Sequence, residues 1–125
     1  MDFDVIIIGG GLVGASLAAA LKSSGLTIGL IESQPPESSK IGWDSRIYAI
    51  SPGNASFLSD CGVWQQLDMS RVQPVSAMRV FGDEDAELDF SAYQSCAPER
   101  SFILENRWVR HALWHVNEEH GATIQ

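Results

Sequence analysis

Three glycines near the start of the chain have the spacing of a dinucleotide-binding loop. Gly9, Gly11 and Gly14 form the pattern G-x-G-x-x-G. In such a loop the first glycine makes a tight turn, the second lets a pyrophosphate approach the backbone, and the third lets a helix pack closely on a strand. The free N–H groups at the start of that helix bind the anion without a lysine. The pattern predicts cofactor contacts along the loop, including Leu12 and Val13.

The second part of this fingerprint is an acidic residue. Glu32 lies eighteen positions after Gly14 and follows a run of apolar residues. A carboxylate at the end of a second strand can accept hydrogen bonds from the hydroxyl groups of an adenosine ribose, and it repels a 2′-phosphate. Glu32 therefore disfavours NADP at this site and leaves FAD and NAD as candidate ligands.

A strand, a helix and a second strand must position these residues. The run Val5–Leu21 contains no charge and approaches the length of a membrane-spanning helix, but three consecutive glycines lie at its centre. We interpret it as a strand over Phe3–Ile8, the glycine loop, and a helix over Leu12–Ser24 that ends before Gly25. A second apolar strand follows at Leu26–Ile31. The pattern predicts an α/β fold with a Rossmann-like βαβ unit.

The remaining sequence predicts further elements around this unit. They are a loop over Ser33–Gly42, a helix from Ser51 to about Cys61, hairpin strands over Val75–Phe81 and Glu87–Phe90, a helix from Asn106 to about His120, and the start of a strand at Ala122–Gln125. Two parallel strands leave open sheet edges that other segments must cover. We therefore expect residues 1–125 to be the front part of a longer protein.

The composition argues against several classes of function. The chain has 16 acidic and 8 basic residues and a formal net charge of −8, which disfavours a surface that follows nucleic-acid phosphates. Its cysteines, Cys61 and Cys96, form no C-x-x-C motif, and Asp2 and Asp4 stand where a secretory leader would carry basic residues. We expect a cytoplasmic protein whose cysteines are buried apolar or incidental surface residues.

Two groups of residues have partial metal-site spacing. His111 and His115 lie one helical turn apart, but the segment between them lacks the glutamate of H-E-x-x-H. The acidic residues that alternate from Asp83 to Asp89 resemble the start of a calcium loop, but Leu88 replaces its glycine and Gln94 its final glutamate. We predict solvated or partly packed histidines, a hydrated hairpin turn, and no metal site.

Two longer segments resemble one enzyme family. In Asp44–Trp64 the sequence has Asp-x-Arg, then Ala-Ile-Ser, then Gly-Val-Trp after a helix, and in Leu104–Trp114 it has Glu-Asn followed by Ala-Leu-Trp. With the glycine fingerprint, these motifs resemble the flavoprotein aromatic hydroxylases of ubiquinone biosynthesis, the UbiH/UbiF/VisC/Coq6 family. The resemblance implies a two-domain fold like that of para-hydroxybenzoate hydroxylase, with residues 1–125 as an incomplete N-terminal portion of its FAD-binding domain.

The resemblance also implies an activity and roles for individual residues. In such monooxygenases NAD(P)H reduces bound FAD, and O2 then hydroxylates an electron-rich phenol ring, so no catalytic nucleophile or acid/base pair is needed and we find none. By position, the glycine loop surrounds the FAD pyrophosphate and Glu32 holds the adenosine ribose. Arg46 then lies on the flavin side of the cofactor, and Asn106 contacts FAD from the start of a helix.

The implied partners follow from the implied substrate. A polyprenylated phenol or quinol would bring the protein to the inner membrane surface and to other ubiquinone-pathway proteins. Because the family's later flavin-contacting segments are absent from this chain, the predicted activity belongs to the parent protein. Two alternatives are another FAD-dependent oxidoreductase of the same architecture and a non-catalytic dinucleotide-binding module.

Overall fold

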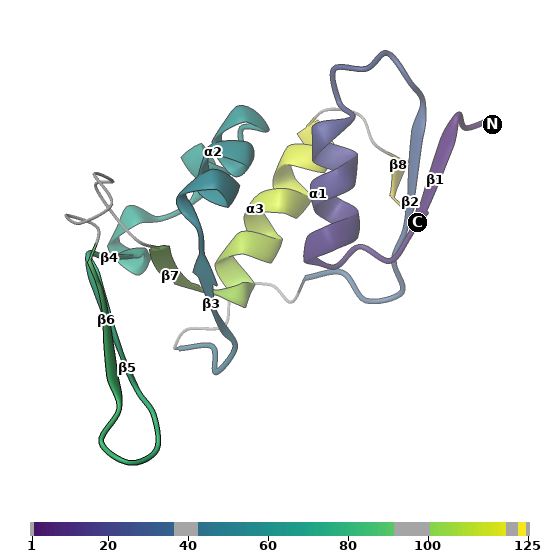
Figure 1. The fold of residues 1–125 in the computed structure, drawn as a ribbon. Helices are drawn as coiled ribbons and strands as arrows, with labels where there is room; N and C mark the ends of the chain where they lie inside the picture. Colours follow the sequence, from purple (N-terminus) through teal and green to yellow (C-terminus); the bar gives the residue numbers. More distant parts are fainter. Residues whose placement is uncertain (1, 37–42, 92–100, 120–122, 125) are drawn as a thin grey trace.

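The computed structural model describes residues 2–36, 43–91, 101–119 and 123–124 (Figure 1). Its first sheet contains three parallel strands in the order β1–β2–β8, which are Val5–Ile8, Ile28–Ile31 and Thr123–Ile124. Helix α1, Leu12–Ala20, connects β1 to β2 and lies beside this sheet (Figure 1). The predicted βαβ unit is confirmed, and the predicted final strand pairs with β2.

The uncharged run Val5–Leu21 is a strand, a loop and a helix. Within the described ranges, no helix combines the length and the apolar character needed to cross a membrane. Helix α1 ends earlier than predicted, with Leu21 as its C-cap, although Gly25 has the expected positive φ of 79°. The hydroxyl of Ser24 explains the early end, because it donates to the Leu21 carbonyl at 2.6 Å and accepts from the Leu26 amide at 3.2 Å.

A second sheet contains two strands that the sequence analysis missed. Its order is β3–β7–β4, all antiparallel, with β3 at Ile47–Ile50, β7 at Ser101–Glu105 and β4 at Gln73–Val75. Strands β3 and β7 were not expected. Most of the strand predicted over Val75–Phe81 is present as β5, Ala77–Phe81, but Val75 belongs to β4.

The predicted hairpin is present and projects from the rest of the structure (Figure 1). Strand β5 pairs with β6, Glu87–Ser91, and Val80 lies opposite Leu88. The turn places Glu84 and Asp85 at φ 58° and 60°, which are the two positive angles of a type I′ turn. The acidic run is therefore a hairpin turn, as predicted.

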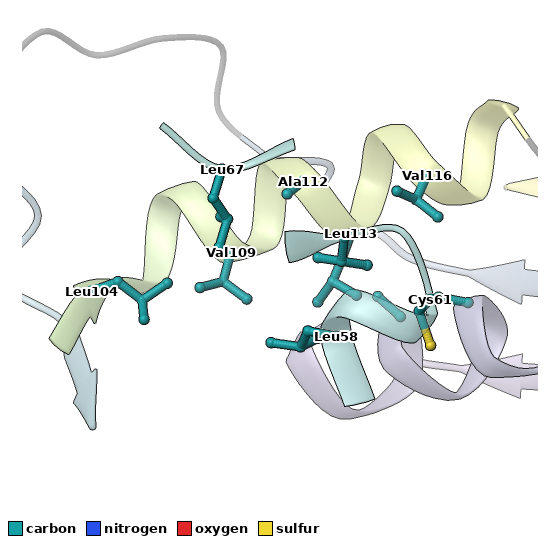
Figure 2. Packing of buried hydrophobic residues seen from close by; sticks show 11 residues of the cluster. Leu58, Cys61, Leu67, Leu104, Val109, Ala112, Leu113 and Val116 are labelled. Carbon is teal, nitrogen blue, oxygen red and sulfur yellow. The ribbon is translucent and has the colours of Figure 1, made fainter. Parts of the chain in front are cut away.

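The main core lies among the helices and β7. Helix α2 is Pro52–Asp60, α3 is Asn106–Glu119, and two short 3-10 helices, η1 and η2, cover Trp64–Gln66 and Met69–Arg71. Side chains from α2, α3 and the segments near them form one buried cluster, shown in Figure 2: Leu58, Cys61, Leu67, Leu104, Val109, Ala112, Leu113 and Val116. Val109, Leu113 and Val116 thus form the buried face of α3.

Helix α1 packs on both sides through alanines. Ala18 joins a small cluster with the sheet residues Ile7 and Leu30, whereas Ala15 and Ala19 join the main cluster with α3. These small side chains allow close approach both to the sheet and to α3. The buried amide of Asn117 strengthens this contact by donating to the Ala15 carbonyl at 3.0 Å.

The predicted behaviour of Cys61 is confirmed. Its side chain is buried, and burial raises the pKa of the thiol above its ordinary value. A buried thiol with a raised pKa is a weak nucleophile. Cys96 lies outside the described residues.

Ser51 makes the expected N-cap of α2. Its hydroxyl accepts from the Asn54 amide at 3.2 Å, and Pro52 occupies the first turn. Replacing Ser51 with alanine should lower the free energy of unfolding by about 1 kcal/mol, because one amide of the first turn loses its acceptor. Urea denaturation of the purified protein measures this change. Ser51→Asp keeps an acceptor and should stay close to wild type, and equal losses in both variants would contradict the capping role.

Candidate dinucleotide-binding site

The glycine loop connects the end of β1 to the start of α1 and contacts the end of β2. Gly9 has φ +100°, which disfavours any side chain, and its amide donates to the Ile31 carbonyl at 2.8 Å. A Cβ atom at Gly14 would lie 1.9 Å from the Gly9 carbonyl oxygen and 3.2 Å from Ile7 Cγ2. These two glycines are therefore required by the turn and by helix–strand packing.

Gly11 differs from these two glycines because the space beside it is open. A Cβ atom at this position would meet nothing within 4 Å. Gly11 is also the N-cap of α1, and no side chain caps this helix. The first-turn amides of a helix lack partners within the helix, so an anion placed beside Gly11 can accept from them. The open space and the donors fit a pyrophosphate.

Glu32 lies against this loop. Its Oε2 atom accepts from the Gly10 amide at 2.7 Å, and Oε1 accepts from the Gln34 amide at 2.8 Å. The amide of Gln34, that of Gly10 and the Arg110 guanidinium hold the pKa of the Glu32 carboxyl below its ordinary value. The side chain is 14% exposed. An ionised carboxylate with remaining lone pairs can accept further bonds from ribose hydroxyls.

The structure brings Arg46 and Asn106 together at a second group of residues. Arg46 precedes β3 and Asn106 begins α3, and the Asn106 amide donates to the Arg46 carbonyl at 2.9 Å. Both residues line a pocket of about 270 Å³. Its full lining is Pro36, Asp44, Arg46, Asn106, Arg107, Arg110 and His111.

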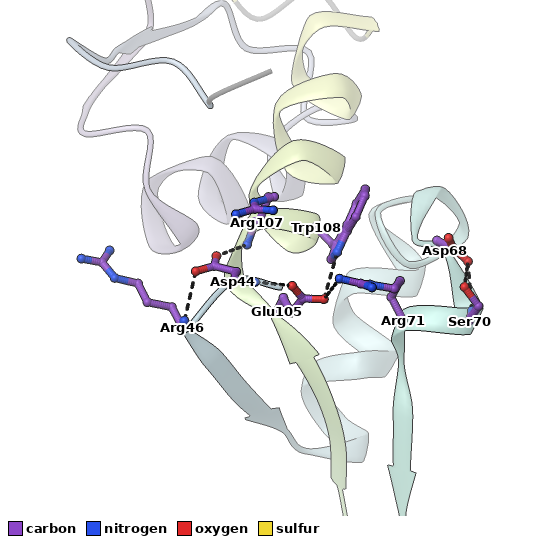
Figure 3. Close-up of polar contacts among 8 residues, drawn as sticks. All are labelled: Asp44, Arg46, Asp68, Ser70, Arg71, Glu105, Arg107 and Trp108. Carbon is purple, nitrogen blue, oxygen red and sulfur yellow. Dashed lines mark hydrogen bonds and ion pairs between the residues drawn. The ribbon is translucent and has the colours of Figure 1, made fainter. Parts of the chain in front are cut away.

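Asp44 orders one wall of this pocket (Figure 3). Its carboxylate accepts from the Arg46 amide at 3.0 Å and from the Arg107 amide, in the first turn of α3, at 3.1 Å. The Arg46 amide, and then the amide and charge of Arg107, hold the pKa of Asp44 below its ordinary value. The Arg46 guanidinium extends away from Asp44 in this view.

The buried carboxylate of Glu105 holds Asp44 in place. Glu105 is 2% exposed and accepts from the Asp44 amide at 2.6 Å, while Arg71 Nη2 lies 2.5 Å from its other oxygen (Figure 3). The Trp108 indole also donates to Glu105, at 3.2 Å, and the Arg71 guanidinium lies 3.7 Å from the centre of the Trp43 ring. Burial alone would raise the pKa of Glu105, but these donors together lower it.

Arg110 connects the two groups of residues. Its Nη2 lies 3.8 Å from Glu32 Oε2 and donates to the Gln34 carbonyl. Sequence reasoning missed Arg107, Arg110 and His111. A signal was present, because this acidic chain has only 8 Lys and Arg residues and three of them line this one pocket.

Leu12 and Val13 lie away from the pocket that contains Arg46 and Asn106. Leu12 packs against the main core, whereas Val13 is 86% exposed. Both line an apolar pocket of about 450 Å³ between α1, α2 and α3. They are therefore not part of the pocket that contains Arg46 and Asn106.

Both histidines of α3 line a second pocket, of about 460 Å³. His111 also lines the pocket that contains Arg46, while His115 Nε2 lies 3.1 Å from Glu119 Oε1. Among the described residues, no group of three potential metal ligands is close enough to hold an ion.

Comparison with known proteins places this arrangement among flavoproteins. The family model described as "FAD binding domain" matches residues 2–125. The chain is 32% identical over 119 residues to 3-demethoxyubiquinol 3-hydroxylase of Escherichia coli, covering 94% of this chain and 30% of that protein. It is 34% identical over 112 residues to ubiquinone hydroxylase UbiL of Rhodospirillum rubrum, covering 88% of this chain and 26% of that protein. The chain thus spans less than a third of the length of these relatives.

Solved structures share the fold at lower sequence identity. The tetrameric form of 2-methyl-3-hydroxypyridine-5-carboxylic acid oxygenase matches with a TM-score of 0.71 at 16% identity, covering 97% of this chain and 30% of that one. The flavin-dependent brominase Bmp2 matches with a TM-score of 0.72 at 19% identity, covering 98% and 29%. These likenesses confirm the fold class expected from the sequence.

Proposed function

The chain belongs to the FAD-binding domain family, and on this premise we propose that it forms the N-terminal portion of the FAD-binding domain of a ring-hydroxylating monooxygenase. The proposed substrate is a polyprenyl phenol or benzoquinol of ubiquinone biosynthesis, with NAD(P)H and O2 as co-substrates. The relatives' names, 3-demethoxyubiquinol 3-hydroxylase and ubiquinone hydroxylase, support this substrate class. Residues 1–125 then form an incomplete domain, with the remaining FAD-binding residues and the substrate domain in the rest of the parent protein.

The observation that carries the proposal is the open, uncapped start of α1 beside an ionised carboxylate. When bound, FAD supplies the redox chemistry and the activation of oxygen. The amides near Gly11 bind its pyrophosphate, and Glu32 accepts from its adenosine ribose. Arg46 and Asn106 hold the cofactor from the neighbouring pocket, where the guanidinium offsets negative charge.

The proposal also assigns a cellular position. A polyprenyl chain keeps its ring near a lipid surface, so we propose that the parent protein works in the cytoplasm at the inner membrane, in contact with other ubiquinone-pathway proteins. Flotation of the full-length protein with vesicles tests this position. Recovery of the protein only in the vesicle-free fractions of the gradient, with or without substrate, would contradict it.

The activity is tested with the full-length protein. We expect purified protein to carry FAD, and a polyprenyl phenol or quinol to stimulate NAD(P)H oxidation with incorporation of one atom of labelled O2 into the product. Bound FAD without stimulated oxidation or labelled product would instead indicate another FAD-dependent oxidoreductase. A full-length protein that binds no FAD would contradict the whole proposal.

The role of Glu32 gives a direct binding prediction. Glu32→Gln removes a charged acceptor and places an amide group near the Gly10 N–H, so FAD should bind about tenfold more weakly. Fluorescence titration of the full-length apoprotein measures the dissociation constant. Glu87→Gln is the matched control, because it makes the same chemical change on the projecting hairpin and should leave FAD binding unchanged. Wild-type affinity in Glu32→Gln would contradict the ribose assignment.

A further inference from the structure

Arg110 joins two segments that are distant in the sequence. It lies in the second turn of α3, and its guanidinium reaches the chain just after β2. There its Nη2 donates to the Gln34 carbonyl and forms an ion pair with Glu32 Oε2 at 3.8 Å. One cation therefore holds both the carboxylate and the backbone that follows it.

The surroundings of Arg110 make this contact more than a surface ion pair. The side chain of Arg110 is 25% exposed and that of Glu32 is 14% exposed. Charges in such partly buried positions are screened less by salt than exposed charges. The Nε atom of Arg110 is buried and has no hydrogen-bond partner among the described residues. Such a donor is costly unless a ligand or water satisfies it.

The geometry around Glu32 explains what Arg110 can do for a ligand. Each carboxylate oxygen already accepts one backbone amide, from Gly10 and from Gln34. Arg110 pairs with the oxygen that Gly10 binds and also holds the carbonyl of Gln34. These contacts prevent the Glu32 carboxylate from rotating. Its remaining lone pairs therefore point in a constant direction. A fixed acceptor loses less conformational freedom when a hydroxyl group binds to it.

We propose that Arg110 is a positioning residue for the adenosine half of the cofactor, acting by orienting Glu32 toward the ribose hydroxyls. This inference rests on the proposed function, since it needs FAD at the glycine loop. Arginine suits the role because its planar fork can contact two acceptors from one group, whereas a lysine ammonium is a single point charge. Arg110→Lys should therefore restore binding only in part.

A double-mutant cycle on the full-length apoprotein tests the inference, with FAD as the probe. In the wild-type background, Arg110→Gln should weaken FAD binding about tenfold. In the Glu32→Gln background the same change should weaken it less than about twofold, because the oriented carboxylate is already absent. Arg79→Gln is the control for loss of a positive charge, since Arg79 pairs with Glu87 and Asp89 on the hairpin.

The outcomes separate the inference from the function on which it rests. Equal losses in the two backgrounds would mean that Arg110 acts independently of Glu32 and would overturn the inference, as would unchanged affinity in Arg110→Gln. Both results leave FAD binding by the wild type intact. Failure of the wild type to bind FAD would instead overturn the proposed function. Melting temperatures of the apoproteins should agree for wild type and Arg110→Gln, and a strongly lowered value would assign Arg110 a structural role and overturn the positioning role.

Discussion

Replacing Gly14 with alanine is expected to destabilise the protein by about 3 kcal/mol, because the added methyl group has no space. It would lie 1.9 Å from the Gly9 carbonyl oxygen, which is backbone and cannot rotate away. Helix α1 would have to move off β1, and the anion-binding loop would be lost with it. Thermal denaturation of the full-length protein should show a strongly lowered melting temperature for the domain. An unchanged melting temperature would contradict the close contact between Gly14 and the Gly9 carbonyl.

Gly11→Ala should affect FAD binding with little effect on stability, in contrast to Gly14→Ala. Gly11 has φ −71° and ψ −168°, a conformation that alanine adopts, and its Cβ would meet no protein atom within 4 Å. Stability should change by less than about 1 kcal/mol. FAD should bind about 10- to 100-fold more weakly, because the methyl group occupies the space assigned to the pyrophosphate. A stable Gly11→Ala protein with wild-type FAD affinity would place the pyrophosphate elsewhere.

The second large effect is expected at Glu105. Removing this side chain in Glu105→Ala breaks the buried ion pair with Arg71 and removes the acceptor of the Asp44 amide. Loss of one partner of a buried pair should cost about 3 kcal/mol, near the lower end of the usual range because Arg71 is 21% exposed. Urea denaturation measures the loss. Asp89→Asn breaks a pair whose side chains are 60% and 55% exposed and should cost less than about 1 kcal/mol.

Glu105 also predicts how stability depends on pH. Its folded-state pKa lies below the ordinary value of 4.5, so the unfolded state binds the proton more tightly. The stabilisation is fully present above that ordinary value and is lost as pH falls through the lower folded-state pKa. Unfolding free energies measured from pH 6 downward should therefore fall more steeply for wild type than for Glu105→Gln. Parallel curves for the two proteins would contradict a lowered pKa.

The sequence by itself determined the parts of this protein that depend on local patterns. The order of strand, glycine loop, helix, strand and Glu32 identified the βαβ unit, because each piece is specified by residues a few positions apart. The same holds for the hairpin and for the apolar face of α3. The resemblance to ubiquinone-biosynthesis hydroxylases was also visible in the sequence, because it rests on short motifs. The family model and the relatives confirm it.

Only the tertiary structure determined how the two halves of the site meet. Strands β3 and β7 were missed because they form by pairing with each other, Ile47 opposite Glu105, across nearly half of the chain. The contact between Arg110 and Gln34 spans 76 positions, and that between Asp44 and Glu105 spans 61. No local pattern encodes such distances. Residues that act through long-range contacts become visible only when packing has brought their elements together.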